Sequence, residues 1–210
     1  MGDVSKRDIT EASAVKEKAP LYGAVLAFNV KVLPDAEEEA KNRRIPIFKH
    51  NIIYHLIDEY LDWMRAEKEA REKGEFEKLI RPAKLKVLPG YVFRRAKPAI
   101  VGVQVLAGQV KPRLQFMTKE GKEVGEVLQI QDRGETVSSA AVGKEVAVSF
   151  DKAVVGRHFN EGDILYVRVP ESHARDLLAK FRDRLSPEEI ETLEELAKIR
   201  IREDSLLGNA

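Results

Sequence analysis

Residues 51–80 read NIIYHLIDEYLDWMRAEKEAREKGEFEKLI, and this stretch changes character halfway along. Its first half carries apolar residues at helical spacing, which predicts a helix with one buried face and Asn51 as its N-cap. The segment Arg65–Lys73 keeps strong helix formers but has no apolar face. It is either a frayed surface helix or, as we favour, a rigid rod that joins two domains. The expected i,i+4 ion pairs are Glu67–Arg71 and Glu69–Lys73.

The composition excludes several classes of protein. A chain of 210 residues can form one large or two small domains with buried cores. It has no cysteine, which excludes disulfides and thiolate metal sites and fits a reducing compartment. No apolar run approaches the length of a membrane span, and the N-terminus has no secretory apolar core. We therefore expect a cytoplasmic protein with no membrane partner.

The net charge of +1 conceals an uneven distribution. Residues 81–170 hold 15 Lys and Arg against 9 Asp and Glu. Residues 1–80 hold 14 against 16, and residues 171–210 hold 7 against 10. A polyanion would therefore bind the basic middle segment.

The N-terminal segment has the pattern of a βαβα unit. The apolar run 24–30 predicts a strand covered on both faces, and a second short strand is expected at 46–48 after a helix at 35–44. Ser5-Lys6-Arg7-Asp8 is a capping box that predicts a helix to about Lys18. Two short parallel strands make a thin sheet, so we expect this chain to begin partway into an α/β domain.

Residues 91–169 change to short alternating strands separated by turn signals, which predicts an antiparallel barrel or sandwich. Val101, Val103 and Val105 share one face. After the strands, Ser186-Pro187-Glu188-Glu189 is a strong helix start, so the tail is expected to form a helical hairpin docked on the barrel. The expected strands are 100–106, 109–117, 124–131, 145–150 and 164–169.

Signatures of catalysis are missing from the sequence. It contains no phosphate-binding loop, no dinucleotide-binding glycine motif and no nucleophile elbow. The four histidines lack metal-ligand spacing. We expect no catalytic or metal site, and an enzyme with a site in the α/β cleft is the weaker hypothesis. The loop Gln129–Glu135 is either a polar hairpin or a rim that contacts phosphates and base edges.

Four groups of residues occur in order along essentially the whole chain: Tyr22–Pro34, Gly90–Val103, Gln129–Gly134, and Glu161-Gly162-Asp163 followed by Pro170–Ala174. Together they closely resemble translation initiation factor five-B, the archaeal and eukaryotic relative of bacterial initiation factor two. The resemblance is to the C-terminal half of that factor, without its GTPase domain.

The resemblance implies a fold of α/β plus all-β class in four parts. These are a partial α/β/α domain (1–50), a long connecting helix (51–81), an antiparallel β-barrel of the translation-factor type (82–170) and a C-terminal helix pair (171–210). It further implies a non-catalytic region of an archaeal-type factor that promotes ribosomal subunit joining. GTP and Mg²⁺ would be bound by an upstream domain, with no cofactor in this chain.

The implied partners are the ribosome, initiator methionyl-tRNA and the C-terminal tail of initiation factor one-A, and we expect a monomer. Val103 and Val146 would line an apolar pocket for methionine. A protein-interaction scaffold that binds no RNA is the alternative. The residues implied for the tRNA acceptor end are Val103, Gln131, Asp132, Arg133, Gly134, Glu145, Val146 and Ala147. Those implied for the partner peptide are Arg175, Leu178, Phe181, Arg182, Ile190 and Leu193, unless the apolar ones all pack inward and no groove exists.

Overall fold

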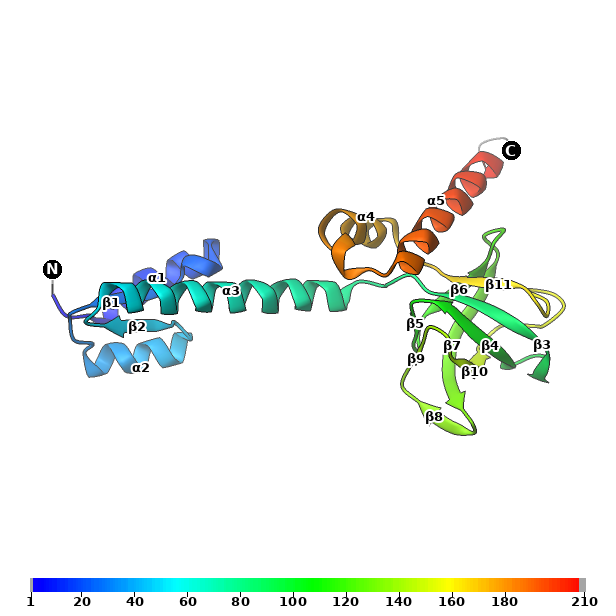
Figure 1. Ribbon diagram of the computed structural model, residues 1–210, viewed down its shortest axis with the longest axis horizontal. Coiled ribbons are helices and arrows are strands. Elements are labelled where there is room, and N and C mark those ends of the chain that lie inside the picture. Colours follow the sequence, from blue (N-terminus) through cyan, green and yellow to red (C-terminus); the bar gives the residue numbers. More distant parts are fainter. Residues whose placement is uncertain (1, 208–210) are drawn as a thin grey trace. The chain divides into compact units, whose positions relative to one another are not determined.

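The computed structural model describes residues 2–207, with side chains up to Ile201, and separates into two compact units (Figure 1). The first unit comprises Met1–Glu75 and the second Phe76–Ala210. Each unit has its own cluster of buried apolar residues. No helix within the described part of the chain is long and apolar enough to cross a membrane.

The first unit is a two-stranded parallel sheet with helices. Strands β1 (Val25–Phe28) and β2 (Ile47–His50) pair in parallel, as predicted, with α2 (Pro34–Arg43) between them in sequence. Helix α1 (Lys6–Lys18) precedes them and is followed by the short 3-10 helix η1 (Pro20–Tyr22). Its buried cluster joins residues of α1, β1 and α2.

Local signals in this unit gave one confirmed prediction and one error. The capping box of α1 is confirmed, because Asp8 Oδ2 accepts hydrogen bonds from Ser5 N and Ser5 Oγ, each at 2.8 Å. The backbone bond from Ser5 is the main cause that lowers the pKa of Asp8. The prediction that β1 is covered on both faces is wrong. Ala27 is buried, but Leu26 and Phe28 on the opposite face are about half exposed.

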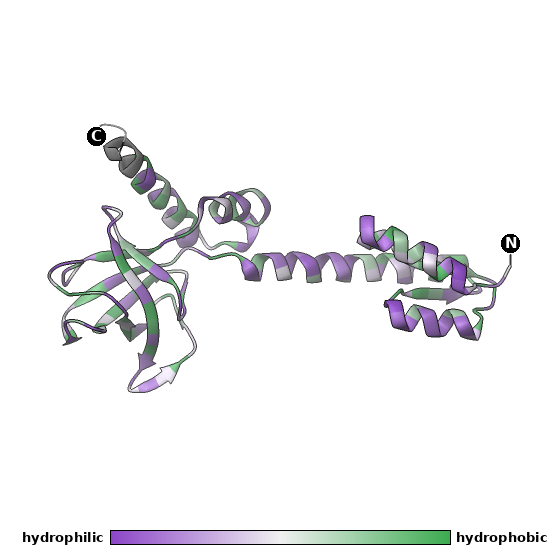
Figure 2. Cartoon of the chain, turned by 180° about the vertical axis from the view of Figure 1, so that it is seen from behind, coloured by the Kyte–Doolittle hydropathy of each residue, from purple (hydrophilic) through white to green (hydrophobic). Residues whose placement is uncertain are grey.

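Helix α3 (Ile53–Lys78) is continuous through Gly74. It begins at Ile53, so Asn51 is not its N-cap. The ion pair Glu67–Arg71 is confirmed at 3.5 Å, whereas the second pair of this segment is Lys68–Glu72 at 3.9 Å and no Glu69–Lys73 pair forms among the described residues. Figure 2 shows that hydrophilic residues predominate along the middle of α3, and the rod interpretation stays a prediction.

The second unit contains a closed antiparallel β-barrel, which confirms the predicted fold class. The neighbouring strands run in the order β10-β4-β3-β11-β6-β7, and a further pairing of β7 with β10 closes the ring. Strand β8 (Glu135–Val137) extends β7 as a hairpin, and β5 (Gln109–Val110) pairs with β9 (Ala140–Ala141). The bounds of the barrel strands are β3 (Lys84–Arg94), β4 (Ala99–Ala107), β6 (Gln115–Thr118), β7 (Glu123–Asp132), β10 (Glu145–Phe150) and β11 (Ile164–Val167).

The barrel interior is filled with apolar side chains. Val101, Val103 and Val105 of β4 are all buried in it, as their alternation predicts. Phe150 has edge-on contacts with the rings of Phe116 and Phe159, at centroid distances of 5.7 and 6.0 Å. The interior is therefore a packed core, and any binding site must lie on the outer surface.

The C-terminal helices pack on the barrel, as predicted. They are α4 (Glu171–Lys180) and α5 (Pro187–Leu207), with the 3-10 helix η2 (Arg182–Arg184) between them. Leu177, Leu193 and Leu196 belong to the same buried cluster as the barrel strands. The helices and the barrel therefore share one core.

Candidate functional site

A cavity lies on the outer surface of the barrel where β10 runs between β4 and β7. Ala147 of β10 stands opposite Gly102 on one side and Gln131 on the other. Because successive residues of a strand face opposite sides, these three form a row on the outer surface. The cavity above the row has a volume of about 810 Å³. Its lining residues are Leu88, Tyr91, Phe93, Ile100, Gly102, Gln131, Asp132, Arg133, Gly134, Gly143, Lys144, Glu145, Val146 and Ala147.

The β7–β8 hairpin forms one wall of this cavity. Asp132 pairs with Glu135, which leaves Arg133 and Gly134 as a two-residue turn with φ of 52° and 89°. Positive φ at both positions is typical of the type I′ turn that suits a tight hairpin. Holding Arg133 in this conformation costs on the order of 1 kcal/mol. The turn projects the Arg133 side chain into solvent, and it forms no ion pair within the described part of the chain.

A bulge in β3 forms the opposite wall. Val87 pairs with Val103 and Val92 pairs with Val101, so the residues Leu88–Tyr91 all stand against the single residue Gly102. Gly90 has a φ of 81°, and its N–H donates to a carboxylate oxygen of Glu161 at 2.6 Å. A bulge bends a strand and redirects its side chains. This one turns Tyr91 toward the cavity.

Gly102 is required by the close approach of this bulge. A Cβ atom at position 102 would lie only 2.7 Å from the Cβ atom of Tyr91, a separation that side chains do not tolerate. Tyr91 and Phe93 remain 55% and 64% exposed and line the cavity rim. The site thus combines a flat floor of small residues with two exposed aromatic rings.

Unpaired positive charge lies beside one edge of the cavity. Among the residues that line the cavity, the positive charges of Arg133 and Lys144 are balanced by the negative charges of Asp132 and Glu145. Lys144 Nζ lies 3.8 Å from Asp132 Oδ2. The chain directly after Phe93 carries Arg94, Arg95 and Lys97, all exposed and without an ion pair among the described residues. An anionic ligand would therefore be attracted to the rim, while the floor suits an apolar or neutral group.

Seven of the eight residues implied for the tRNA acceptor end converge on this cavity. The exception is Val103, which does not line the cavity. Val103 is fully buried inside the barrel because it lies on the inner face of β4, one residue from the outer-face Gly102. Val146, its strand partner, is also mostly buried but reaches the cavity wall.

Sequence reasoning missed the aromatic rim and the glycine floor. Tyr91, Phe93, Ile100 and Gly102 lay in a recognised motif but had no assigned role. The alternation of Tyr91 and Phe93 in a strand next to a basic run is a signal that could have found them. These side chains meet at Gly102 because of the bulge in β3, and the alternation of residues in the sequence does not predict that bulge.

A second hollow of about 420 Å³ lies between α4, α5 and the end of the barrel. Three of the six residues implied for a partner peptide line it, namely Arg175, Leu178 and Leu193. The other three do not. Phe181 is buried against Phe76 with ring centroids 5.4 Å apart, Ile190 packs into the common core, and Arg182 is exposed in η2 outside the hollow.

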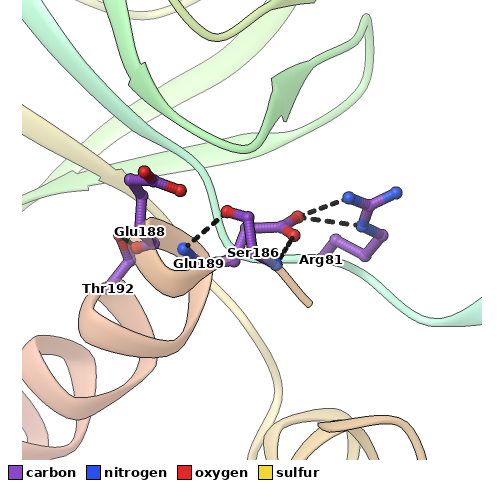
Figure 3. Close-up of polar contacts among 5 residues, drawn as sticks. All are labelled: Arg81, Ser186, Glu188, Glu189 and Thr192. Atoms are coloured by element: carbon purple, nitrogen blue, oxygen red, sulfur yellow. Dashed lines mark hydrogen bonds and ion pairs between the residues drawn. The ribbon is translucent and has the colours of Figure 1, made fainter. Parts of the chain in front are cut away.

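An ion pair between the half-exposed Arg81 and the buried Glu189 fixes the start of α5 (Figure 3). Glu189 is only 2% exposed, and its Oε1 accepts hydrogen bonds from Arg81 Nε at 3.0 Å and Nη2 at 2.5 Å. The predicted helix start is confirmed and forms a capping box, because Glu189 Oε2 accepts from Ser186 N and Ser186 Oγ accepts from Glu189 N. One turn further, Thr192 Oγ1 donates to the carbonyl of Glu188 at 2.7 Å. The carboxylate is fully paired, so its burial is tolerated.

A second contact holds α5 against β3. Lys84 Nζ donates to both carboxylate oxygens of Glu195 at 3.1 Å. Burial, with a hydrogen bond to Glu195, raises the pKa of Tyr166 above its ordinary value. Among the described residues, no three His, Cys, Asp or Glu side chains form a group that could hold a metal ion.

Comparisons with known proteins identify both units. Residues 81–166 match the family model described as Elongation factor Tu domain 4, and residues 1–61 match the one described as Translation-initiation factor 2. A probable translation initiation factor IF-2 from Ignicoccus hospitalis is 49% identical over 99% of the chain. Its counterpart from Caldivirga maquilingensis is 49% identical over 95% of the chain. The chain spans 34% of the length of each.

A solved structure of a translation initiation factor is also similar to this chain. GDP-bound aIF5B from Aeropyrum pernix is 46% identical, with a TM-score of 0.62, over 97% of this chain and 34% of that chain. The barrel and the matching models define the class as translation factors. Within that class, the chain belongs to the translation initiation factor IF-2 family, and it corresponds to the C-terminal part of aIF5B.

Proposed function

We propose that this chain acts in translation initiation as part of a longer factor that promotes ribosomal subunit joining, and that its barrel cavity binds the methionylated 3′ end of initiator tRNA. The observation that carries the proposal is the convergence of seven family-implied residues on one cavity of about 810 Å³. Arg133 at the tip of its hairpin is suited to contact the RNA backbone, and Gln131 offers amide groups to sugar or base edges.

The size and chemistry of the cavity support this ligand. The floor residues Ile100, Gly102 and Ala147 are apolar, which suits the side chain of an esterified amino acid. The basic excess of residues 81–170 favours a polyanion over a neutral molecule. A charged 3′ end combines both properties, since an apolar group is attached there to a phosphodiester chain.

The removal of one charge tests the proposed RNA contact. Arg133→Ala should weaken binding of methionylated initiator tRNA by about 1–3 kcal/mol, as expected for a charged hydrogen bond lost at an interface. Arg168→Ala is the matched control, because it removes one exposed charge from the barrel outside the cavity. Fluorescence anisotropy at several salt concentrations measures the tRNA affinity of both variants. If the unmodified chain does not bind tRNA, or if its binding does not weaken with added salt, the protein-interaction scaffold replaces this proposal.

The hollow between α4 and α5 supports a second role, binding of the C-terminal tail of initiation factor one-A. Leu178 and Ile201 are partly exposed at its edge, and Arg175 and Arg200 also line it. Exposed apolar side chains next to cations suit an amphipathic segment with acidic residues.

Calorimetry with that tail as a synthetic peptide tests the second role. Arg175→Glu should weaken peptide binding and leave the melting temperature nearly unchanged, because Arg175 is on the surface. Arg182→Glu is the control with the same charge change outside the hollow. The absence of peptide binding to the unmodified chain would mean that the helices serve only to cap the barrel.

A further inference from the structure

The two aromatic rings at the cavity rim lack the contacts that usually explain such side chains. Tyr91 and Phe93 are more than half exposed, whereas Phe116, Phe150 and Phe159 of the same unit are buried. Neither Tyr91 nor Phe93 stacks on another ring or on a cation within the described part of the chain. Two large rings kept in water side by side on one strand are therefore available to a ligand.

The backbone is built to hold these rings outward. Four residues of β3 bulge against the single residue Gly102, which lacks the Cβ atom that would collide with Tyr91. The turn within the bulge uses Gly90 at positive φ, and the Glu161 carboxylate accepts its N–H. A regular strand would have placed one residue, not four, opposite Gly102. The bulge therefore holds the Tyr91 side chain in a fixed position at the cavity rim.

The neighbouring charges indicate the kind of ligand. Arg94, Arg95 and Lys97 follow the rings in sequence and carry positive charge without carboxylate partners among the described residues. Exposed aromatic rings beside free cations are the combination by which proteins hold single-stranded nucleic acid, because every base has a flat face and every nucleotide a phosphate. The basic excess of residues 81–170 likewise favours a polyanion.

We propose that Tyr91 and Phe93 form a stacking platform for the unpaired nucleobases at the 3′ end of the bound RNA, with Glu161 as the positioning residue that holds the bulge. This inference rests on the proposed function and adds to it how the nucleotides before the esterified end are held. Stacking reads the flat face of a base and not its edge, so the platform selects for unpaired nucleotides and not for their sequence.

Substitution by leucine tests the platform. Tyr91→Leu and Phe93→Leu keep apolar bulk but remove the ring, and each should weaken binding of a methionylated RNA hairpin with an unpaired 3′ end by about tenfold. Tyr91→Phe and Phe93→Trp should keep the affinity within about twofold, because each retains a flat ring. Leu128→Ala removes a similarly exposed apolar side chain of the barrel outside the cavity and should change nothing.

The salt dependence separates stacking from charge. The leucine variants should lose affinity equally at all salt concentrations, since no phosphate contact is removed. Arg133→Ala should instead reduce the slope of log affinity against log salt by about one. Glu161→Ala should weaken binding less than either leucine variant, while Glu161→Gln, which still offers an oxygen to the Gly90 N–H, should restore most of it.

A tryptophan reporter observes the contact directly. The chain has a single tryptophan, Trp63, in the first unit, so Phe93→Trp in a Trp63→Phe background reports only the platform. Its fluorescence should be quenched by the hairpin with an unpaired 3′ end and not by a blunt-ended hairpin. If the unmodified chain binds no RNA end, the proposed function fails. If it binds but the leucine variants bind equally well and the reporter is not quenched, only the platform is wrong.

Discussion

The barrel and the α/β unit bury their strands to very different degrees. In β4 of the barrel, Val101, Val103 and Val105 are all buried, and the ring of paired strands leaves its six members without a free edge. In the first unit, β1 and β2 form a sheet of two strands, and Leu26 and Phe28 are about half exposed on one face of β1. The closed barrel satisfies its own backbone and core, so it holds the cavity residues in fixed register without help from the first unit.

This difference assigns different roles to the two units. The cavity depends on pairings such as Ala147 with Gly102 and Gln131, all of which lie within the second unit. The first unit has an apolar face on β1 and α3 that its own helices leave uncovered, with Ile57 and Leu61 exposed on α3. We therefore expect changes in the barrel core to affect both stability and binding, and changes in the first unit to affect neither strongly.

The largest effect should come from the barrel core. Phe150→Ala removes a fully buried ring that contacts Phe116 and Phe159, and it should lower the free energy of unfolding of the second unit by about 3–5 kcal/mol. Phe28→Ala is the matched change in the first unit and should cost about 1 kcal/mol or less, because the ring is already half exposed. Denaturant unfolding by circular dichroism, with Trp63 fluorescence for the first unit, measures both. Equal costs would contradict the comparison.

A break in α3 should come next. Replacing Glu69-Ala70 with Gly-Pro in the segment without an apolar face should destabilise that part of the helix by about 3–4 kcal/mol. Folding of the barrel and its affinity for the tRNA end should be unchanged, since the cavity uses no residue of the first unit. The measurements are far-ultraviolet circular dichroism and the tRNA titration. A fall in tRNA affinity would show that the barrel is not self-sufficient.

A smaller effect is expected from the ion pair that anchors α5. Arg81→Ala leaves the buried Glu189 without its charged partner and should cost the second unit about 1–3 kcal/mol. Arg175→Ala removes the exposed pair with Glu171 at 2.8 Å and should cost less than about 1 kcal/mol. The two variants have the same side-chain change, so a difference in melting temperature reports the burial of Glu189 together with the contact of Arg81 with the Phe76 ring. No difference would mean that Arg81 contributes nothing beyond a surface charge.

The smallest effect concerns the acid sensitivity of the first unit. The hydrogen bonds from Ser5 lower the pKa of Asp8 in the folded state. A carboxylate with a lowered folded pKa stabilises the fold above its unfolded pKa, and this contribution disappears as the pH falls through the folded pKa. Asp8→Asn should therefore lower the stability of the first unit at neutral pH and make no difference at strongly acidic pH. A constant gap between the two proteins at all pH values would contradict the assignment.

The sequence predicts the barrel well where one face of a strand is buried. The segment 145–150 matches β10, and the alternation of Val101, Val103 and Val105 gives the correct inner face. Two boundaries were wrong for physical reasons. The first expected strand of the barrel begins at residue 100, whereas the structure adds β3 (Lys84–Arg94), which the bulge at Gly90 interrupts. The expected strand 109–117 is split into β5 and β6 because Pro112 and the positive φ of Arg113 interrupt it.

The two candidate sites were not equally predictable. In a strand, a one-residue step separates the inner Val103 from the outer Gly102, so the residues implied for the tRNA end share one cavity except Val103. In the helices, an apolar stripe serves both the common core and the hollow. Spacing alone could not tell that Phe181 packs on Phe76 while Leu178 stays partly exposed. That distinction depends on contacts between elements distant in the sequence.

The measurement that tests the central claim most directly compares two forms of one ligand. Methionylated and deacylated initiator tRNA are titrated separately into the unmodified chain at the same salt concentration. We predict tighter binding of the methionylated form, because only that form fills the apolar floor beside Gly102 and Ala147 while both forms share the contacts of the RNA backbone. Equal affinity for the two forms would contradict recognition of the charged end and leave only general RNA binding by the basic barrel.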